Sequence, residues 1–416
     1  MPGTQPKRRE YDLLLVGATG HTGSLTAQHI VRHFPPNLRW VLAGRSEAKL
    51  QRLRESLPLN PTGIGSPNIQ VLNLSESDRD TANLDDLIRR SCVCISVVTY
   101  FAVGELVIRS CVENETNYID AIGDVILLER LIAKYHNTAE RKGVKLIHAA
   151  GIFGGVQNLL AWAAARELAQ QASLKTQEVA LAMDTMKLIP SRGTIESFLH
   201  EAGRGKDIRK KTLEPWLLSS VEGSPDILNS TNKMNMRINM DLGALSATSI
   251  TAKQNQLLVH RSWGLLKGSQ EDYGANFKYN EYMRGVSAML SLLTTIGHPF
   301  VDWLLGFKIV RNIVRRALQR NHPTSPGEAD LVVMEAVAIA DVENPDEAPR
   351  GYATLRYPEG PYSLTGLMLA QGAASILYSG RECEKGGCLT TALIAADLIQ
   401  RLKGADIAIE STILPY

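Results

Sequence analysis

The sequence predicts an α/β protein with a Rossmann-type, doubly wound parallel sheet and a second, mixed α+β domain. Three observations support this prediction. Short apolar runs alternate with amphipathic stretches from residue 12 to residue 151, a glycine-rich turn follows the first run, and the alternation stops after Gly151. Strands that alternate with helices imply right-handed crossovers, and these produce a parallel sheet.

The composition is that of an ordinary globular protein. The chain has 416 residues, 44% of them apolar, which is enough for two domains with sizeable cores. The formal net charge is only +2 and the basic run at 7–9 is short, so we expect no nucleic-acid partner. The first twelve residues lack the apolar segment of a secretory signal. The five cysteines have no zinc-site spacing, and we expect buried thiols and a cytoplasmic protein; they are Cys92, Cys94, Cys111, Cys383 and Cys388.

The first half of the chain predicts six strands with helices between them. The run at 12–16 is almost wholly apolar, which is typical of a strand buried on both faces. The next helix carries an apolar stripe, and Pro35-Pro36 ends it. Strands are expected at 12–16, 39–44, 68–74, 93–100, 117–122 and 144–151, and helices up to about 33 and at 47–57, 84–90, 104–113 and 126–142. Residues 1–150 are therefore expected to form one nucleotide-binding domain.

The second half has a different rhythm. We expect helices at 156–172, 283–320, 362–378 and 390–403, and strands at 177–183, 330–342 and 352–357, with polar, strand-like stretches up to about 262. Residues 151–360 are expected to form a domain for substrate binding and oligomerisation. The helices of 361–416 could pack back on the first domain.

The glycine-rich turn at 17–23 is a candidate phosphate-binding loop. Gly17 would form the tight turn, Gly20 would let the backbone approach a pyrophosphate, and Gly23 would allow close packing of helix and strand. The start of the following helix offers N–H groups and a partial positive charge to phosphates. The cofactor-binding residues predicted in this loop are Gly17, Thr19, Gly20, His21, Thr22 and Gly23.

The end of the second strand predicts the preferred nucleotide. NAD-dependent enzymes usually have a carboxylate there, which accepts a hydrogen bond from the ribose 2′-hydroxyl. This chain instead has Arg45 and Ser46, with Lys49 one helical turn further on. An arginine can pair bidentately with a 2′-phosphate. The sequence therefore predicts NADP(H) rather than NAD(H), the alternative for Arg45 being a solvated surface side chain.

Several segments together resemble a known family. GATGHTG (17–23), AGRSEAKL (43–50), the run at 104–124 and RGTIES (192–197) resemble the saccharopine dehydrogenase-like oxidoreductases, and within them the trans-acting enoyl reductases. The resemblance is good over the first 200 residues, poor over 205–320, and returns at 326–328 and 359–377. It implies a Rossmann domain, an NADP(H) or NAD(H) cofactor and a second domain that covers the nicotinamide. Saccharopine-type members reduce an imine, whereas the enoyl reductase branch reduces a carbon–carbon double bond in a polyketide chain carried by a partner synthase.

The chain also departs from the family pattern. Val98-Thr99-Tyr100 stands where the family usually has Gly-Pro-Tyr, and Gly123-Asp124 where it has Gly-Glu. The segment 151–156 lacks the family's aspartate and proline. The tyrosine is kept, one carboxylate is shortened and another is lost. These departures concern the reaction and leave the expected fold unchanged.

Candidate catalytic residues follow from the topology. Ligands of open α/β sheets lie beyond the carboxyl ends of the strands, which places the nicotinamide over 98–101 and selects Val98 and Thr99 as cofactor contacts. Tyr100 could donate a hydrogen bond and act as general acid, or be an aromatic wall. Each of the other three candidates has a structural alternative: Asp124 as a helix N-cap, Asp120 as a residue facing a helix end, and His148 as a satisfied core histidine.

Two further segments are candidates for binding a ligand, a membrane or a partner. Residues 191–194 open a predicted helix and could bind substrate or cofactor, or simply cap that helix. Residues 286–306 are long and apolar enough to raise the question of a membrane span. Because Gly297-His298-Pro299 and Asp302 interrupt the apolar run, we expect two short amphipathic helices, which could line a substrate tunnel, lie on a lipid surface or form a dimer contact.

The function expected from these observations is NADPH-dependent reduction of a hydrophobic unsaturated substrate, such as a polyketide intermediate presented by a carrier domain of a polyketide synthase. One alternative is a saccharopine-type imine reductase that binds acidic substrates through Arg204, Arg209 and Lys210-Lys211. Another is a protein that keeps NADP(H) as a structural part, either a cyclase or isomerase or a binding partner. No metal-ligand spacing is present in the sequence.

Overall fold

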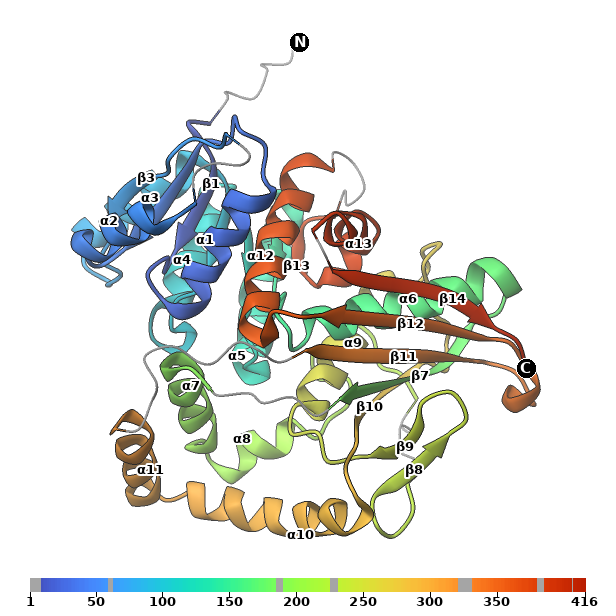
Figure 1. Ribbon diagram of the computed structural model, residues 1–416. Coiled ribbons are helices and arrows are strands. Elements are labelled where there is room, and N and C mark those ends of the chain that lie inside the picture. The colour runs from blue at the N-terminus through green and yellow to red at the C-terminus, as the bar shows by residue number, and fades with distance from the viewer. Residues whose placement is uncertain are drawn as a thin grey trace. The chain divides into compact units, whose positions relative to one another are not determined.

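The computed structural model describes residues 9–58, 63–184, 190–224, 231–320, 331–379, 385–405 and 407–416. These residues form two compact units, each built around its own sheet (Figure 1). Unit 1 comprises Met1–Ile122, Leu131–Gly151 and Thr365–Leu389, and unit 2 comprises Gly123–Arg130, Ile152–Leu364 and Thr390–Tyr416. Each unit is therefore assembled from segments that are far apart in the sequence.

Unit 1 contains a parallel sheet of seven strands. Their order is β13-β6-β5-β4-β1-β2-β3, and β1 pairs with both β2 and β4. The chain passes from β1 to one side for β2 and β3 and then crosses to the other side for β4, so the carboxyl ends of β1 and β4 mark the switch point where nucleotides bind. The strands are β1 (Tyr11–Val16), β2 (Trp40–Gly44), β3 (Asn68–Val71), β4 (Ser91–Ser96), β5 (Asn117–Asp120), β6 (Lys145–Ile147) and β13 (Gly387–Leu389). The predicted parallel sheet is confirmed, and β13 joins its edge from a distant part of the chain.

The helices of unit 1 lie between these strands in sequence. They are α1 (His21–His33), α2 (Glu47–Ser56), α3 (Asp78–Arg89), the π-helical turn η1 (Tyr100–Gly104), α4 (Glu105–Glu113) and most of α5 (Val125–Arg141). Helix α3 starts six residues earlier than expected, because the Ser77 hydroxyl accepts the N–H of Asp80 and caps it. The strand expected at 93–100 ends at Ser96, since the chain turns into η1 at Tyr100.

The core of unit 1 explains the apolar runs. Leu13, Leu14 and Leu15 on β1 are completely buried, as the central position of that strand requires. Helix α12 (Gly360–Tyr378) contributes residues 365–378, and its glycines allow close approach. A Cβ on Gly366 would lie 2.9 Å from the backbone nitrogen of Thr26 in α1, so α12 packs directly against that helix.

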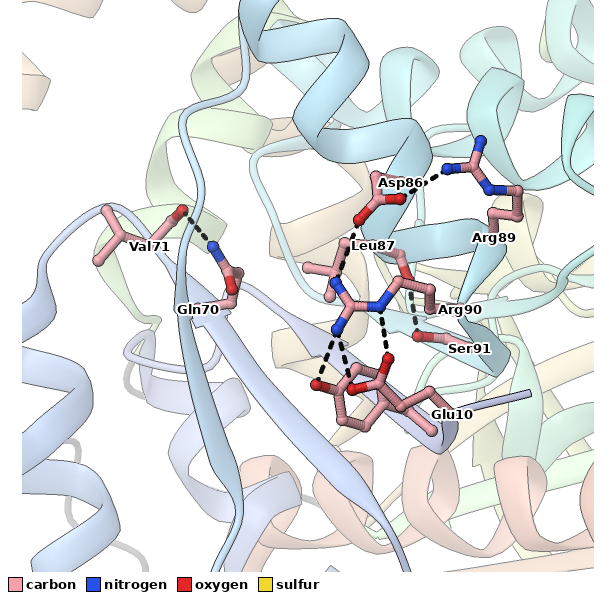
Figure 2. Close-up of polar contacts among 9 residues, drawn as sticks. Glu10, Gln70, Val71, Asp86, Leu87, Arg89, Arg90 and Ser91 are labelled. Atoms are coloured by element: carbon pink, nitrogen blue, oxygen red, sulfur yellow. Dashed lines mark hydrogen bonds and ion pairs between the residues drawn. The ribbon is translucent and has the colours of Figure 1, made fainter. Parts of the chain in front are cut away.

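Arg90 ties the start of β1 to the end of α3 (Figure 2). Its guanidinium donates to both carboxylate oxygens of Glu10, at 2.7 and 2.9 Å, and to Asp86 at 3.1 Å. The hydrogen bonds from Arg90 lower the pKa of Glu10 to about 2. This exposed network lies at the end of β1 opposite to the glycine-rich turn, so it supports the sheet without facing the nucleotide side.

Unit 2 contains a mixed sheet, also of seven strands, in the order β14-β12-β11-β7-β10-β9-β8. Only the β7–β10 pair is parallel, and the other pairs are antiparallel. The strands are β7 (Thr176–Asp184), β8 (Met236–Asn239), β9 (Gly243–Ser246), β10 (Lys278–Arg284), β11 (Val332–Ala340), β12 (Arg350–Tyr357) and β14 (Ala408–Leu414). The prediction of a second, mixed α+β part is confirmed, although β10 and β14 were not expected.

Helix α6 (Gly155–Ala172) lies on one face of this sheet and α9 (Ala252–Leu266) packs against β10 (Figure 1). A Cβ on Gly351 of β12 would clash with the Ala164 carbonyl, so the contact with α6 requires glycine. Helix α9 was not predicted, because polar residues on its buried face obscured the helical pattern; Asn255 and Gln256 are both buried. The remaining helices are α7 (Arg192–Ala202), α8 (Lys206–Lys211), α10 (Ala288–Leu305), α11 (Lys308–Arg320), α13 (Ala395–Lys403) and the short 3₁₀ turns η2 (Pro345–Glu347) and η3 (Thr391–Ile394).

The prediction that 286–306 would form two short helices is wrong. Helix α10 runs without interruption from Ala288 to Leu305, through Gly297-His298-Pro299. A proline inside a helix removes one backbone hydrogen bond and tends to kink the helix, but the other bonds of an 18-residue helix remain. Among the described residues, α10 is the one helix that by length and composition could cross a membrane.

Candidate functional site

The glycine-rich turn of unit 1 has a geometry that only glycine permits at two positions. Gly17 has a φ of +87°, in the left-handed region, and a Cβ there would lie 3.0 Å from the backbone of Val97. A Cβ on Gly23 would clash with the Gly17 carbonyl and lie 2.8 Å from the Ala18 carbonyl. The turn is thus folded tightly onto the start of α1 and against the segment that follows β4.

Helix α1 begins immediately after this turn. Gly20 occupies the N-cap position and no side chain caps the helix. The backbone N–H groups of a first helical turn have no acceptor within the helix, and the helix dipole adds a partial positive charge. The first turn holds His21, Thr22 and Gly23, so the N-terminus of α1 can receive a pyrophosphate as predicted from the sequence.

Three polar side chains gather at the carboxyl end of β2. Arg45 follows β2 directly, Ser46 is the N-cap residue of α2, and Lys49 lies in its first turn. The side chains of Arg45 and Lys49 are exposed and form no hydrogen bond or ion pair with any residue that the structure describes, and the Ser46 side chain does not cap α2. Thr19 in the glycine-rich turn reaches the same place, since its Oγ1 would be 3.6 Å from a Cβ on Gly44. An anion at this point would meet the two uncommitted cations and the hydroxyls of Ser46 and Thr19.

The segment after β4 forms the other side of this region. Val97 donates its N–H to the Val16 carbonyl at 3.0 Å, which holds the segment beside the glycine-rich turn. Val98 is half-buried and Thr99 is exposed at the start of η1. Both predicted cofactor contacts therefore lie beyond the carboxyl end of β4, next to the switch point of the sheet.

Tyr100 joins the ends of two strands. Its hydroxyl donates to the Ser96 carbonyl at 2.8 Å and accepts the N–H of Ala121 at 3.1 Å. Burial, and then the charge of Asp120, raise the pKa of the Tyr100 phenol well above its usual value of 10. In this arrangement the hydroxyl is engaged by backbone groups from the ends of β4 and β5, and donation to a substrate would break the bond to Ser96.

Asp120 and His148 form a buried pair. One Asp120 oxygen lies 2.7 Å from His148 Nδ1, and the other accepts the N–H groups of Ile122 and Ala149, each at 3.0 Å. Burial lowers the pKa of His148, but the charge of Asp120 and the hydrogen bond to it outweigh burial and raise that pKa to about 10. His148 therefore keeps its proton at neutral pH, and its contact with Asp120 fixes the turns that follow β5 and β6.

Asp124 belongs to unit 2 and has two structural roles there. It is the residue before α5, and its Oδ1 accepts the N–H of Leu127 at 3.0 Å, the bond of a helix N-cap. Its two oxygens also accept both terminal nitrogens of Arg204, which is a bidentate ion pair. Arg204, one of the cations considered for binding an acidic substrate, is therefore already paired with Asp124.

Glu201 is a candidate residue that the sequence did not indicate. It lies at the end of α7 and accepts a hydrogen bond from the Gln254 amide at 3.0 Å. Burial, and then the charge of Asp124, raise the pKa of Glu201 to about 7. A carboxyl group that titrates near neutral pH can serve as acid or base. No local pattern marks it, because its partners come from positions 124, 204 and 254.

A second group that the sequence did not indicate lies on β7 and β10 of unit 2. Glu178 is buried and accepts hydrogen bonds from Arg237 at 2.6 Å and Asn280 at 2.7 Å. Glu281, on the opposite face of β10, accepts from Ser249, Thr251, Asn255 and Tyr279. The consecutive polar residues Asn280 and Glu281 in KYNEYMR (278–284) were a usable signal, since successive side chains of a strand point to opposite faces and this pair therefore puts a polar group on each face.

The residues 191–194 form a helix cap. The Ser191 hydroxyl accepts the N–H of Thr194 at 3.2 Å, and the Tyr362 hydroxyl contacts both residues, at 2.6 Å from Ser191 N and 2.8 Å from Thr194 Oγ1. Arg192 and Gly193 are exposed at the start of α7. The contacts within unit 2 account for Ser191 and Thr194 without a ligand.

Comparison with known proteins supports the assignment of unit 1. Residues 13–147 match the family described as the saccharopine dehydrogenase NADP binding domain. The trans-acting enoyl reductase of Mycobacterium tuberculosis is 26% identical over 425 residues, covering 98% of this chain and 99% of its own length. The protein of the same name from Mycobacterium ulcerans is 25% identical over 423 residues, with 97% and 98% coverage.

A solved structure has the same overall fold. Saccharopine dehydrogenase (L-Glu forming) from Saccharomyces cerevisiae matches with a TM-score of 0.52 and 13% identity, covering 97% of this chain and 100% of its own. Together these findings confirm the predicted resemblance. The match to the NADP binding domain confirms the predicted cofactor, NADP(H). Residues 13–147 are a saccharopine dehydrogenase-type NADP-binding domain, and the chain that carries it is an NADP-dependent oxidoreductase.

Proposed function

We propose that the protein reduces the conjugated double bond of a hydrophobic enoyl substrate with NADPH. The observation that carries this proposal is the similarity to trans-acting enoyl reductases, which extends over 98% of the chain and thus includes both units. The similarity to saccharopine dehydrogenase supports the fold alone, because only 13% of the residues are identical.

The residues of unit 1 fit NADPH. The glycine-rich turn leaves no room for side chains at Gly17 and Gly23, which keeps the backbone accessible at the start of α1. Arg45 and Lys49 offer two uncommitted positive charges where a 2′-phosphate would lie, and Ser46 offers a hydroxyl. When bound, NADPH supplies the hydride for the reduction.

The predicted catalytic residues would position the site and not transfer protons. Tyr100 holds the end of β4 against the turn after β5, and Asp120 with His148 fixes the turns after β5 and β6. Asp124 is engaged by Arg204 and by the start of α5. The Tyr100 hydroxyl, the Asp120 and Asp124 carboxylates and Nδ1 of His148 are all engaged, so we propose that water provides the proton that the α-carbon of the substrate takes up.

The substrate class is a polyketide intermediate presented by a carrier domain of a partner synthase, and we propose a cytoplasmic location. The names of the relatives support a trans-acting role, in which the reductase is a chain separate from its synthase. The imine reductase alternative loses support, because Arg204, one of the cations considered for an acidic substrate, is bound to Asp124.

Calorimetric titration of NADPH and NADH tests the cofactor part of the proposal. A charge-assisted hydrogen bond contributes roughly 1.5–3 kcal/mol, so Arg45→Ala should weaken NADPH binding at least about tenfold and leave NADH binding nearly unchanged. Arg52→Ala is the matched control: this exposed arginine lies two turns along α2 and bonds only to the Ala48 carbonyl. Equal losses in the two variants would contradict a 2′-phosphate site at Arg45.

Hydride transfer tests the reaction itself. The protein should oxidise deuterium-labelled NADPH in the presence of an enoyl thioester, and the label should appear at the β-carbon of the product. A saturated thioester of the same length is the control for uncoupled oxidation. Tight NADPH binding without transfer to any enoyl thioester would leave the cofactor assignment intact and remove the proposed reaction.

A further inference from the structure

Helix α10 of unit 2 exposes a continuous apolar stripe. Five large side chains recur at intervals of four, three, four and three residues, which places them on one face of the helix. They are Met289, Leu293, Ile296, Phe300 and Trp303, with exposed fractions of 69, 59, 67, 60 and 52%. A helix of a soluble protein normally turns such a stripe inward, so this face is built to meet an apolar partner.

Helix α11 extends the same surface and adds positive charge. Ile309 and Ile313 are exposed beside the cations Lys308 and Arg316. Residues 288–320 contain five lysine or arginine residues and a single carboxylate, Asp302, so this segment has a formal charge of +4. Apolar side chains next to basic ones are the combination that binds the surface of a membrane with anionic lipids.

Both ends of α10 are held to the rest of unit 2. Near its start, the Ser291 hydroxyl donates to the Met234 carbonyl at 2.9 Å and accepts from Ser246 at 2.8 Å. At its end, Leu305 packs in an apolar cluster with Ile195 and Leu199 of α7. A helix that crossed a bilayer would carry these two ends to opposite sides, so contacts at both ends with the same unit argue against a membrane-spanning α10.

Helix α11 is also held to unit 2, through contacts with α7. Val310 and Val314 pack against the cluster formed by Ile195, Leu199 and Leu305, and Arg315 donates to both carboxylate oxygens of Glu196 at 3.0 and 3.1 Å. The buried side of α11 thus faces α7, which leaves Ile309 and Ile313 on its outer side. The exposed faces of the two helices belong to one body held together by α7.

We propose that the α10–α11 surface binds the surface of an anionic lipid membrane, with α10 lying in the plane of the headgroups. The occupant follows from charge: a second copy of this chain would bring the exposed cations Lys308 and Arg316 against the same two cations, whereas anionic headgroups complement them. The proposal is independent of the reaction, so vesicle binding can succeed or fail whatever substrate the enzyme reduces.

Vesicle flotation of the full chain tests the proposal. The wild type should float with phosphatidylcholine vesicles that contain phosphatidylserine, and less with phosphatidylcholine alone or at high salt. The double variant Ile296→Glu/Phe300→Glu should bind at least about tenfold more weakly, because two apolar side chains that would enter the membrane are replaced by charged ones. Lys308→Glu and Arg316→Glu should each weaken binding about fivefold or more.

Leu213→Glu is the control, since it introduces a negative charge at an exposed aliphatic residue of unit 2 that lies outside α10 and α11. It should float like the wild type, and NADPH titration should show that every variant is folded. Absence of wild-type binding to the anionic vesicles at low salt would overturn the proposal. So would a stable dimer without lipid that Ile296→Glu/Phe300→Glu converts to monomer, because the stripe would then be a contact between two copies.

Discussion

At the scale of single residues, substitution of Tyr100 distinguishes a structural role of its hydroxyl from a catalytic one. It satisfies the Ser96 carbonyl and the Ala121 N–H, and Tyr100→Phe leaves both without this partner. We therefore expect a loss of about 1–3 kcal/mol in the free energy of unfolding, measured with urea. The rate of enoyl reduction should stay within about tenfold of the wild type. A general acid would instead lose on the order of 10²–10⁴ in rate, with a changed pH profile.

The pair of His148 and Asp120 predicts a pH dependence of stability. The pKa of His148 is raised from 6.5 to about 10 in the folded protein, so its contribution is complete below about pH 6.5 and is lost as the pH rises to 10. Across that window the folded chain holds a proton that the unfolded chain releases, which costs at most about 1.4 kcal/mol of stability per pH unit.

His148→Asn removes this titration and keeps a donor that can reach Asp120. Urea unfolding of both proteins at several pH values between 7 and 9 should give a slope for the wild type that the variant lacks. Parallel slopes would mean that His148 is neutral in the folded protein.

Which site residues were predictable depends on how far apart their partners lie in the sequence. Gly17, Gly23 and Arg45 belong to one strand–turn–helix–strand unit, so their geometry follows from local sequence. Asp124 and Arg204 are 80 residues apart, and their ion pair forms only when α5 and α7 come together. No periodicity carries that information, and the sequence accordingly left both residues with several open roles.

At the scale of elements, Gly23 controls how α1 joins the glycine-rich turn. A Cβ at this position meets two backbone carbonyls, of Gly17 and Ala18, which cannot move independently of the turn. Gly23→Ala should therefore cost about 3 kcal/mol of stability or more and abolish measurable NADPH binding. Gly65→Ala is the control, because a Cβ there has no atom within 4 Å. Wild-type affinity for NADPH in the Gly23→Ala protein would show that the turn can open.

The prediction of helices and strands was wrong where polar residues are buried or large apolar residues are exposed. In β10 and α9 the buried residues include Asn280, Glu281 and Asn255, so the apolar pattern of a strand or helix is absent. Asn280 donates a hydrogen bond to Glu178, and Asn255 donates one to Glu281. In α10 the opposite holds, since large apolar side chains are exposed and a proline lies inside a continuous helix. Sequence patterns report where apolar residues recur, and both exceptions depend on partners outside the element.

At the scale of the whole molecule, the segments that make up each unit are not consecutive in the sequence. Unit 1 takes its last strand, β13, and most of α12 from residues 365–389, after the chain has built nearly all of unit 2. The parallel pairing of β13 with β6 joins Cys388 to Leu146, a separation of more than 200 residues. Such a strand of three residues carries no signal of its own, since any short apolar run would serve.

This arrangement predicts that residues 1–151 do not fold independently. Without 365–389, the face of α1 that receives Gly366 and the Ile119 side chain that receives Gly372 would be exposed to water. The lost segment also includes the fully buried Leu367, Met368 and Leu369, each worth roughly 1.5–3 kcal/mol of burial. Expressed alone, residues 1–151 should therefore aggregate or unfold without a cooperative thermal transition, although the glycine-rich turn and Arg45 are both present.

Addition of a peptide of residues 365–389 to the refolding fragment provides the matched test. If α12 and β13 complete the sheet, the peptide should restore a cooperative transition and raise the melting temperature further when NADPH is present, because a ligand stabilises only the folded form that binds it. A scrambled peptide of the same composition should do neither. A fragment that melts cooperatively and binds NADPH as tightly as the full chain would show that β1–β6 with their helices suffice, and that residues 365–389 are an addition to a complete nucleotide-binding domain.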